Sequence, residues 1–553
     1  MAGGMGAVFS PFIIACHKNR NNPLDSGQTE RSADVIIAGG GLGGCAAALA
    51  LLRNGLSVVM TEETDWIGGQ LTAQCVPPDE HQWIESQGST QLYRTLRNNI
   101  RQYYRTHYPL TAAAAGQQYL NPGNGWVSRL CAEPKVAQAV LLEMLAPYTA
   151  SGQLTLLTEH KAVAAEVEGD NVRALKVKHT RSAQETILIA PYFIDATELG
   201  DLLPITGTEY VAGTESQAET QELHAAAVAD PLNQQAFTVC FALTYDRQGI
   251  HTIQKPEEYD FWRNFIPPLT PPWSGKLLDL AYCNPQTLAR REMDFHPDGG
   301  ATANMNWWTY RRIIDKNNFT AGTYKGDISI VNWPQNDYML ANLDGSEEEF
   351  ALHVARAKQL NLSLVYWLQT EAPRPAGGYG WPGLMLLSSA TGTADGMAKY
   401  PYVREARRIK AEFTVLEEHI GKENRFLVSG QNSAPDFFDS VGVGYYQMDL
   451  HPSTRGNNYL DFDALRYRIP LGALIPKRME NLLPAAKNIG TTHLTNGCFR
   501  LHPTEWNIGE AAGMLAACAI QNKITPRAIR NTPALLEDFQ RTIQNQGIQI
   551  TWM

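Results

Sequence analysis

The sequence lacks the features that mark metal-binding, disulfide-rich and nucleic-acid-binding proteins. Its 553 residues include eight cysteines, and no two of them form a C-x-x-C pair. This spacing excludes a zinc or iron–sulfur framework and a dense disulfide scaffold, so we expect no metal and mostly buried cysteines. The net charge of −10 gives no basic footprint for nucleic acid, and we predict no nucleic-acid partner.

The sequence also lacks a convincing membrane span. Residues 35–52 form a run of 18 uncharged residues, which matches the length of a transmembrane helix. Five of the 18 are glycines, clustered between an aliphatic run and an Ala/Leu run. A buried strand, a tight turn and a helix explain this pattern, and we therefore predict no transmembrane span.

The N-terminus resembles an export signal. The segment MAGGMGAVFSPFIIAC is apolar, too short to span a membrane, and followed by polar residues. Residues 13–16 resemble the lipobox of bacterial lipoproteins, in which Cys16 would carry the lipid anchor, although no basic residue precedes Lys18. We expect residues 1–33 to be an exported, lipoprotein-like N-terminus whose residues 17–33 form a solvated tether. The alternative is a disordered arm on a cytoplasmic protein.

A dinucleotide-binding pattern opens at Asp34. A short aliphatic strand leads into Gly39-x-Gly41-x-x-Gly44, with Gly43 beside the last glycine, and then into a helix. These glycines allow a tight turn, close approach of a pyrophosphate and close packing of helix on strand. A second strand over 57–61 ends at Glu62, where a carboxylate binds ribose hydroxyls. The pattern predicts a Rossmann-type domain.

Three further segments resemble flavoproteins and indicate FAD. The segment TDWIGGQLT (64–72) resembles the element in which Gly68, Gly69 and Gln70 run alongside FAD. The segment YFIDATELGD (192–201) resembles the strand end that returns to the cofactor, through Asp195, Ala196 and Thr197. The C-terminal segment CFRLHPTEWNIGEAAG (498–513) enters a helix, with Ala-Ala-Gly at its expected start. By resemblance, the residues that line the ribityl chain or flavin ring are Asn488, Asn507, Ile508, Gly509 and Glu510.

These markers, together with SIVNWPQNDY, YWLQTEAPR, YVREARRI and DLHP, extend along the whole chain. The sequence is similar to bacterial FAD-dependent oxidoreductases with a glutathione-reductase-like Rossmann domain, many of which are exported. The resemblance implies an α/β fold with a discontinuous Rossmann-type FAD-binding domain (34–215 and 470–553) and an inserted α+β substrate domain (216–469). It also implies FAD, and no local signal supports a covalent link. A second glycine-rich run, 377–383, has proline flanks and is expected to be a loop, which argues against a separate NAD(P)H domain.

Local patterns predict the middle of the chain in part. Residues 236–245 are expected to form a buried strand, and residues 346–369 a helix with a capping box made by Ser346 and Glu349. The run VREARRIKAEF (403–413) is expected to be a helix with a solvated charged face. We expect the tryptophans mainly in the core and in cleft walls, where some could also stack on a sugar or aromatic substrate: Trp307, Trp308, Trp333 and Trp381.

Two histidines are candidates for the catalytic base. His502 directly precedes the helix predicted to face the flavin. Strand alternation would place His451 on the same face as Asp449, which would orient the imidazole. Arginine binds carboxylate or phosphate bidentately. The predicted substrate-binding residues are Arg500, Arg404, Asp449 and Tyr446.

The leading hypothesis is an oxidoreductase that takes a hydride from a C–H bond bearing a hydroxyl or amine on a small polar metabolite, for instance a sugar derivative. Electrons would pass to oxygen, a quinone or another carrier. One alternative is a reductase of an activated C=C bond, which predicts an arginine cluster for the substrate's carboxylate. Another is a flavin-binding lipoprotein without turnover.

Overall fold

The computed structural model describes residues 29–300 and 302–553, so the predicted signal and the lipidation site at Cys16 lie outside the described residues. Residues 29–32, expected to end the tether, instead form the exposed strand β1 (Thr29–Ser32). This strand pairs in parallel with β7 (Glu185–Ile189) at the edge of a four-stranded sheet. The sheet continues through β6 (Asn171–His179) to β5 (His160–Glu168).

A five-stranded parallel sheet forms the centre of the first half of the fold. Its strand order is β23 (Leu482–Pro484), β8 (Tyr192–Asp195), β2 (Val35–Ala38), β3 (Val58–Glu62) and β4 (Leu154–Thr158). Every residue of β2 and β3 is buried, as expected for parallel strands covered on both faces. The fold class is α/β as predicted, and the C-terminal section returns to the sheet as β23.

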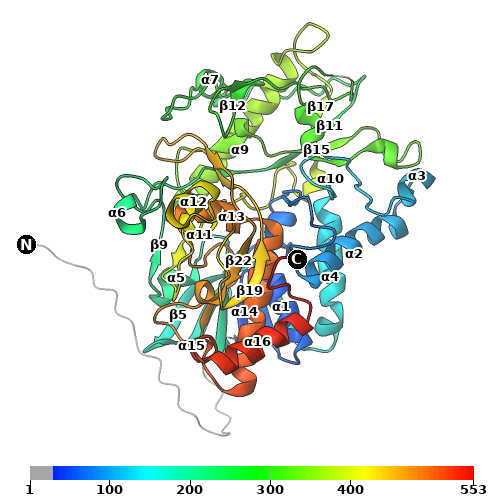
Figure 1. Ribbon diagram of the computed structural model, residues 1–553. Helices are drawn as coiled ribbons and strands as arrows, with labels where there is room; N and C mark the ends of the chain where they lie inside the picture. The colour runs from blue at the N-terminus through cyan, green and yellow to red at the C-terminus, as the bar shows by residue number, and fades with distance from the viewer. Residues whose placement is uncertain (1–28, 301) are drawn as a thin grey trace, which may run out of the picture.

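The second half is built around an antiparallel sheet. Its order is β14 (Arg312–Ile314), β15 (Ile328–Val331), β11 (Phe241–Tyr245) and β17 (Leu384–Leu386). The long helix α9 (Glu347–Thr370) shares a core with this sheet that is rich in tryptophan. Figure 1 shows the sheet and α9 at the opposite end of the molecule from α15 (Pro526–Asn531) and α16 (Pro533–Asn545).

Five short strand pairs form the remaining sheets of the described residues. They are β9 (Tyr210–Val211) with β18 (Arg408–Ile409), β10 (Phe237–Thr238) with β16 (Asp337–Tyr338), β12 (Tyr282–Cys283) with β13 (Arg290–Arg291), β19 (Ser440–Gly444) with β22 (Tyr467–Pro470), and β20 (Met448–Leu450) with β21 (Leu460–Phe462). The predicted boundary between residues 469 and 470 falls inside β22. The division into domains stays a prediction.

The remaining helices alternate with these strands along the chain. The α-helices are α2 (Gln91–His107), α3 (Ala112–Ala115), α4 (Pro134–Ala150), α5 (Leu202–Thr206), α6 (Gln217–Thr220), α7 (Tyr259–Asn264), α8 (Trp307–Tyr310), α10 (Ser388–Thr391), α11 (Glu417–Ile420), α12 (Lys422–Ser429) and α13 (His493–Phe499). The 3-10 turns are η1 (Gly69–Leu71), η2 (Lys316–Asn318), η3 (Pro334–Asn336) and η4 (Leu471–Leu474).

Two helices meet so closely that only glycine fits at their crossing. A Cβ on Gly509 of α14 (His502–Asn522) would lie 2.0 Å from the carbonyl oxygen of Gly43 in α1 (Leu42–Arg53). A Cβ on Gly43 would lie 1.7 Å from the carbonyl oxygen of Ala485, which follows β23. The absence of side chains at these positions therefore holds α1, α14 and the end of β23 in direct backbone contact.

Most local predictions agree with the structure, and three differ from it. Helix α9 has the predicted capping box, since Ser346 accepts from the backbone N–H of Glu349 and Glu349 accepts from that of Ser346. Residues 377–383 form a loop, and the predicted strand 236–245 is interrupted between β10 and β11. The helix predicted over 403–413 is wrong, because this segment is extended and includes β18. Helix α14 begins at His502, a full two turns before the Ala-Ala-Gly expected at its start.

Among the described residues, no helix is long and apolar enough to cross a membrane. The seven described cysteines form no disulfide, and six of them are buried. No group of histidine, cysteine and carboxylate side chains in residues 29–300 and 302–553 is arranged to hold a metal ion.

Replacing Gly509 by alanine tests the helix crossing. We expect Gly509→Ala to lower the free energy of unfolding by about 3 kcal/mol, because the backbone of α1 cannot move aside as a flexible side chain would. Thermal unfolding should show the loss. Gly116→Ala is the matched control, because the nearest atom to its new Cβ would lie 3.4 Å away. Equal melting temperatures for the two variants would contradict the tight crossing.

Candidate active site

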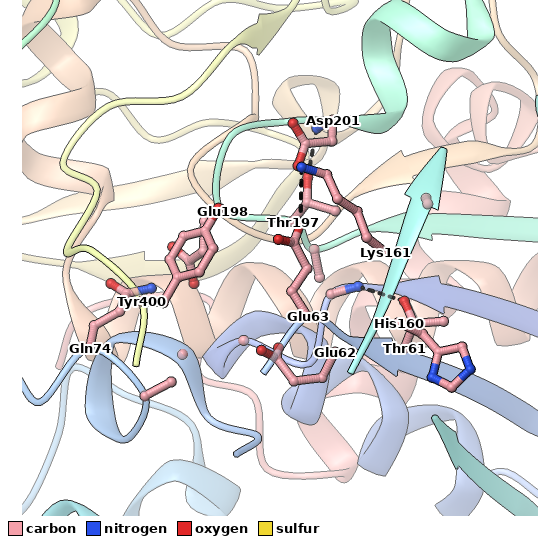
Figure 2. Close-up of a pocket in the computed structure, with 16 residues that line it drawn as sticks. Thr61, Glu62, Glu63, Gln74, His160, Lys161, Thr197, Glu198, Asp201 and Tyr400 are labelled. Atoms are coloured by element: carbon pink, nitrogen blue, oxygen red, sulfur yellow. Dashed lines mark hydrogen bonds and ion pairs between the residues drawn. The ribbon is translucent and has the colours of Figure 1, made fainter. Parts of the chain in front are cut away.

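A narrow cavity of about 30 Å³ lies at the carboxyl ends of β2, β3 and β8 (Figure 2). This is the edge of an open α/β sheet where ligands bind. The lining includes six of the predicted cofactor residues: Gly39, Gly41, Glu62, Gly69, Ala196 and Thr197. Sequence reasoning missed the others, which are Thr61, Glu63, Ala73, Gln74, His160, Lys161, Ala162, Glu198, Asp201 and Tyr400.

The glycine-rich turn is shaped for close backbone approach. Gly39 has φ +95°, and a Cβ there would lie 2.3 Å from the carbonyl oxygen of Ala196. Its N–H donates to the hydroxyl of Thr61 at 3.3 Å. Gly68, also at positive φ, donates its N–H to the carbonyl of Gly40 at 2.7 Å and so holds the Gly-Gly element against the turn.

Glu62 closes the end of β3 with its carboxylate buried beside the turn. One carboxylate oxygen accepts from the N–H of Gly40 at 3.1 Å, and the other accepts from the N–H and hydroxyl of Thr64 at 2.9 and 2.8 Å. Burial raises the pKa of Glu62 to about 7 despite these hydrogen bonds. The carboxylate lies at the end of β3 beside the glycine-rich turn, and its binding to a ribose hydroxyl stays a prediction.

A buried charged cluster lies beside the glycine-rich turn. Lys487 contacts the carboxylate of Glu198 at 2.5 Å and that of Glu505 at 3.7 Å. Glu505 accepts from the N–H of Gly43 at 3.3 Å and from Gln70 at 2.5 Å, so a carboxylate stands at the N-terminus of α1, where anions bind. Burial raises the pKa of Glu505 to about 6.

The residues around this cluster fit FAD. Buried polar atoms without a partner in the described chain lie along it: the Gln70 carbonyl oxygen, both amide atoms of Gln74, and one oxygen of Glu198. Because unpaired buried polar atoms are rare, they mark the place of a polar ligand. Gln70 also donates to the backbone carbonyl of Arg500 at 3.1 Å, which extends the series of contacts towards a second cavity.

The second cavity is lined by charged, polar and aromatic side chains. Its volume is about 310 Å³, and Tyr402 in its wall lies two residues from Tyr400 of the first cavity. Trp307 and Trp333 of the four candidate tryptophans line it, whereas Trp308 and Trp381 pack in the core. All four predicted substrate-binding residues lie in its wall, together with His451: Arg404, Arg500, Tyr446 and Asp449.

His451 has the geometry of an oriented base. Its Nδ1 contacts the carboxylate of Asp337 at 2.6 Å, while its Nε2 lies 3.9 Å from the carboxylate of Asp449. The orienting acid is therefore Asp337 rather than the predicted Asp449, because β20 ends at Leu450 and His451 turns towards β16. Burial and then Arg404 lower the pKa of His451, and together they outweigh both aspartates.

The comparison with protein families decides what the two cavities belong to. The model of the family described as FAD dependent oxidoreductase matches residues 34–543. The chain belongs to the FAD dependent oxidoreductase family. FAD is therefore its cofactor, and the cavity at the glycine-rich turn is the candidate site for it. No curated protein matches the chain.

Solved structures resemble the oxidoreductase only distantly. The p-nitrophenol 4-monooxygenase PnpA from Pseudomonas putida DLL-E4 is 11% identical over 94% of this chain and 88% of its own, with a TM-score of 0.36. A geranylgeranyl bacteriochlorophyll reductase-like protein from Thermoplasma acidophilum is 11% identical over 94% and 85%, with a TM-score of 0.29. L-proline dehydrogenase from P. horikoshii is 16% identical over 34% of this chain, which spans 25% of that protein, with a TM-score of 0.18.

Several residues predicted to hold FAD instead hold the scaffold of the oxidoreductase. Asp195 accepts from the N–H and hydroxyl of Thr197 and from the N–H of Leu202, which fixes the turn after β8. Asn488 donates to the carbonyl of Asp195 at 3.0 Å. Gly44 packs its backbone against the carbonyl of Gly39. These residues shape the cavity without lining it.

The turn of α14 predicted to face the flavin is also structural. Asn507 donates to the carbonyl of Val441 and accepts from the N–H of Val443, so it anchors β19. Gly509 meets α1, Ile508 is fully buried in the core, and Glu510 accepts from Trp506. Since α14 begins earlier than predicted, the turn that reaches the cofactor region is the one that carries Glu505.

His502 is not free to act as a base. Its Nδ1 accepts from the N–H of Asp79 at 3.2 Å, and its Nε2 faces the carbonyl of Val76 at 3.2 Å. Burial lowers its pKa to about 4, so the ring is neutral with a proton on Nε2. With both nitrogens bonded to backbone, the geometry does not support the predicted catalytic role and gives His502 the role of holding residues 76–79.

The two arginines are oriented differently from the prediction. Arg404 is buried and its terminal nitrogens bond to Ala236, Thr238, Asn332 and Asp337, which is incompatible with a solvated helix face. The terminal nitrogens of Arg500 bond to the hydroxyl of Tyr402 and the carboxylate of Asp449. Both terminal nitrogens of each guanidinium already have partners in the protein, so an end-on contact with a substrate would compete with these bonds.

The buried carboxylate of Glu62 predicts pH-dependent FAD affinity. A ribose hydroxyl donates to the ionised form, so protonation below a pKa of about 7 should weaken binding. We expect the dissociation constant of FAD to rise by up to about tenfold between pH 8 and pH 6. Titration of the apoprotein with FAD measures this dissociation constant at each pH. Glu62→Gln should bind FAD weakly at both pH values, and an unchanged pH dependence in this variant would contradict the assignment.

Proposed function

We propose that this FAD-dependent oxidoreductase oxidises a hydroxyl-bearing or amine-bearing carbon of a small polar molecule in the 310 Å³ cavity. The observation that carries the proposal is the contact between His451 and Asp337 at 2.6 Å in the wall of a cavity that adjoins the dinucleotide site. Bound FAD supplies a two-electron acceptor for the hydride of the C–H bond.

The residues of the chain supply the proton transfer and the orientation of the substrate. Neutral His451 takes the proton of the hydroxyl or amine through Nε2, while the carboxylate of Asp337 stabilises the imidazolium that forms. The carbon then becomes a carbonyl or imine. Aromatic walls formed by Trp307, Trp333 and Tyr459 exclude water and offer flat surfaces to a ring.

A second candidate function is supported by a specific observation. Arg311, Arg404 and Arg500 line the same cavity, which is the arginine cluster expected of a reductase that acts on an activated C=C bond beside a carboxylate. The two directions are separated by anaerobic spectroscopy at ~450 nm. Bleaching of the oxidised flavin by sugars, polyols, hydroxy acids or amines supports oxidation. If unsaturated acids re-oxidise a chemically reduced flavin and no donor bleaches the oxidised flavin, reduction of a C=C bond replaces oxidation as the proposed function.

Replacing His451 tests the base. We expect His451→Asn to slow anaerobic flavin reduction by about 10²–10⁴-fold while FAD stays bound. In the wild type the rate should fall at acidic pH, because protonated His451 cannot accept a proton, and the lowered pKa of His451 should place this fall below the pH range of an ordinary histidine. The groups that set this pKa are Arg404, Asp337 and Asp449.

His251→Asn is the matched control for this variant. His251 is a surface histidine that contacts Asp246 at 3.4 Å, outside the cavity. This variant should reduce its flavin at the wild-type rate with the same pH profile. If His451→Asn keeps both the rate and the loss of activity at acidic pH, His451 is not the base.

We also propose, from the sequence alone, that the protein is exported and lipidated at Cys16, that its FAD domain is of the glutathione-reductase-like subtype, and that oxygen, a quinone or another carrier takes the electrons. Mass analysis of the protein from its source cell tests the first point. We expect a lipidated N-terminal Cys16, and an intact Met1 would contradict export.

A further inference from the structure

The lining of the substrate cavity contains several hydrogen-bond donors that have no acceptor. Asn332, Trp333, Arg404, Arg500 and Arg311 all line the cavity, and each has one N–H nitrogen without an acceptor in the part of the chain that the structure describes. These are the amide nitrogen of Asn332, Nε1 of Trp333 and Nε of each arginine. Among the residues that line this cavity, no buried side-chain acceptor is left unpaired.

An unpaired buried donor costs about 1–3 kcal/mol, so five in one wall indicate an acceptor that arrives with the ligand. Asn332 illustrates the arrangement. Its carbonyl oxygen accepts from Arg404 at 3.3 Å, which fixes the amide plane and leaves the NH2 group free. Trp333 stacks on Trp307 with ring centroids 5.4 Å apart, so its ring is held while its N–H stays unbonded.

The same wall surrounds the base. Arg404 contacts Asp337 at 3.0 Å, and Asp337 contacts His451. On the other side, Arg500 contacts Asp449 at 2.8 Å, and Asp449 lies 3.9 Å from His451. Each aspartate is thus shared between the imidazole and a guanidinium: Arg404 pairs with the aspartate at Nδ1, and Arg500 pairs with the aspartate nearest Nε2.

The four arginines and four carboxylates around the cavity balance when all are ionised, and protonation of one carboxylate leaves one positive charge uncompensated. Arg291 lines the wall with the other three arginines, and the opposing carboxylates are Asp79, Asp449 and Asp461 together with Asp337 behind Arg404. Burial and then Asp449 raise the pKa of Asp461 to about 7, so this group is partly protonated at neutral pH. Arg311 pairs with both carboxylate oxygens of Asp79, at 3.4 and 3.5 Å.

We propose that the substrate is an acid, whose carboxylate accepts hydrogen bonds from Asn332, Trp333 and the arginine Nε groups while its hydroxyl or amine faces His451. The substrate class is thus a hydroxy or amino acid, with sugar acids included. A neutral sugar offers donors as well as acceptors, and a phosphate brings close to two charges, so a single carboxylate matches this wall best. This inference rests on the proposal that the cavity is the substrate site.

Binding to the full-length FAD-loaded protein tests the inference independently of turnover. The probes are matched acid and amide pairs: D-glucuronate with D-glucuronamide, D-gluconate with D-gluconamide, and L-lactate with L-lactamide. Calorimetry and the shift of flavin absorbance near ~450 nm report binding. We expect at least one acid to bind more than tenfold tighter than its amide. If no acid is preferred in any pair, the inference is overturned.

Two variants locate the carboxylate. Asn332→Asp keeps the acceptor for Arg404 but replaces the free NH2 by a charged oxygen, and we expect it to remove the preference for the acid. Trp333→Phe deletes only the free N–H and should weaken the acid several-fold. Trp381→Phe is the matched control, because Trp381 also has an unpaired Nε1 but lies outside this cavity, and its acid preference should be unchanged.

The outcomes separate this inference from the proposed function. If acids bind selectively but bleach no flavin, the oxidation proposal fails and the carboxylate site stands. If neutral polyols bleach the flavin and no acid is preferred, the carboxylate site fails and the oxidation stands. If Asn332→Asp or Trp333→Phe releases FAD, these N–H groups serve the cofactor, and the inference is overturned.

Discussion

The backbone contact between α1, α14 and the end of β23 is the constraint on which the rest of the structure depends. Gly43 and Gly509 have no side chains, so the glycine-rich turn, the first turn of α14 and the segment after β23 converge on one point. Glu505 and Lys487 are brought together there, although they come from different elements. A chain segment more than 400 residues away from the glycine-rich turn thereby places a carboxylate against that turn.

The same contact sets the order of the two cavities. From α14 the chain runs back through His502 and Arg500, and His502 uses both ring nitrogens to hold residues 76–79. Arg500 then extends to Tyr402 and Asp449 in the second cavity. His451, held by Asp337, faces that cavity. A series of contacts thus links the candidate cofactor cavity to the candidate substrate cavity.

Sequence could predict the features that depend on local geometry. The turn at Gly39, the acid at Glu62 and the capping box of α9 are each fixed by a few neighbouring residues, and each agrees with the structure. Helix α14 begins earlier than predicted. Pro503 lies in its first turn, where proline is tolerated and does not stop a helix. The solvated helix face predicted for Arg404 is wrong. The charge pattern around it is typical of a helix, but its buried partners come from distant segments.

Long-range partners account for the rest. Asp337 orients His451 from 114 residues away, and no local pattern indicates that pairing. The Lys487 cluster likewise joins residues almost 300 positions apart. The most direct test is a crystal structure of the full chain with FAD and a bound acid. The account predicts the flavin ring between the two cavities and the acid beside His451 and Asn332; a ring or an acid bound elsewhere would contradict it.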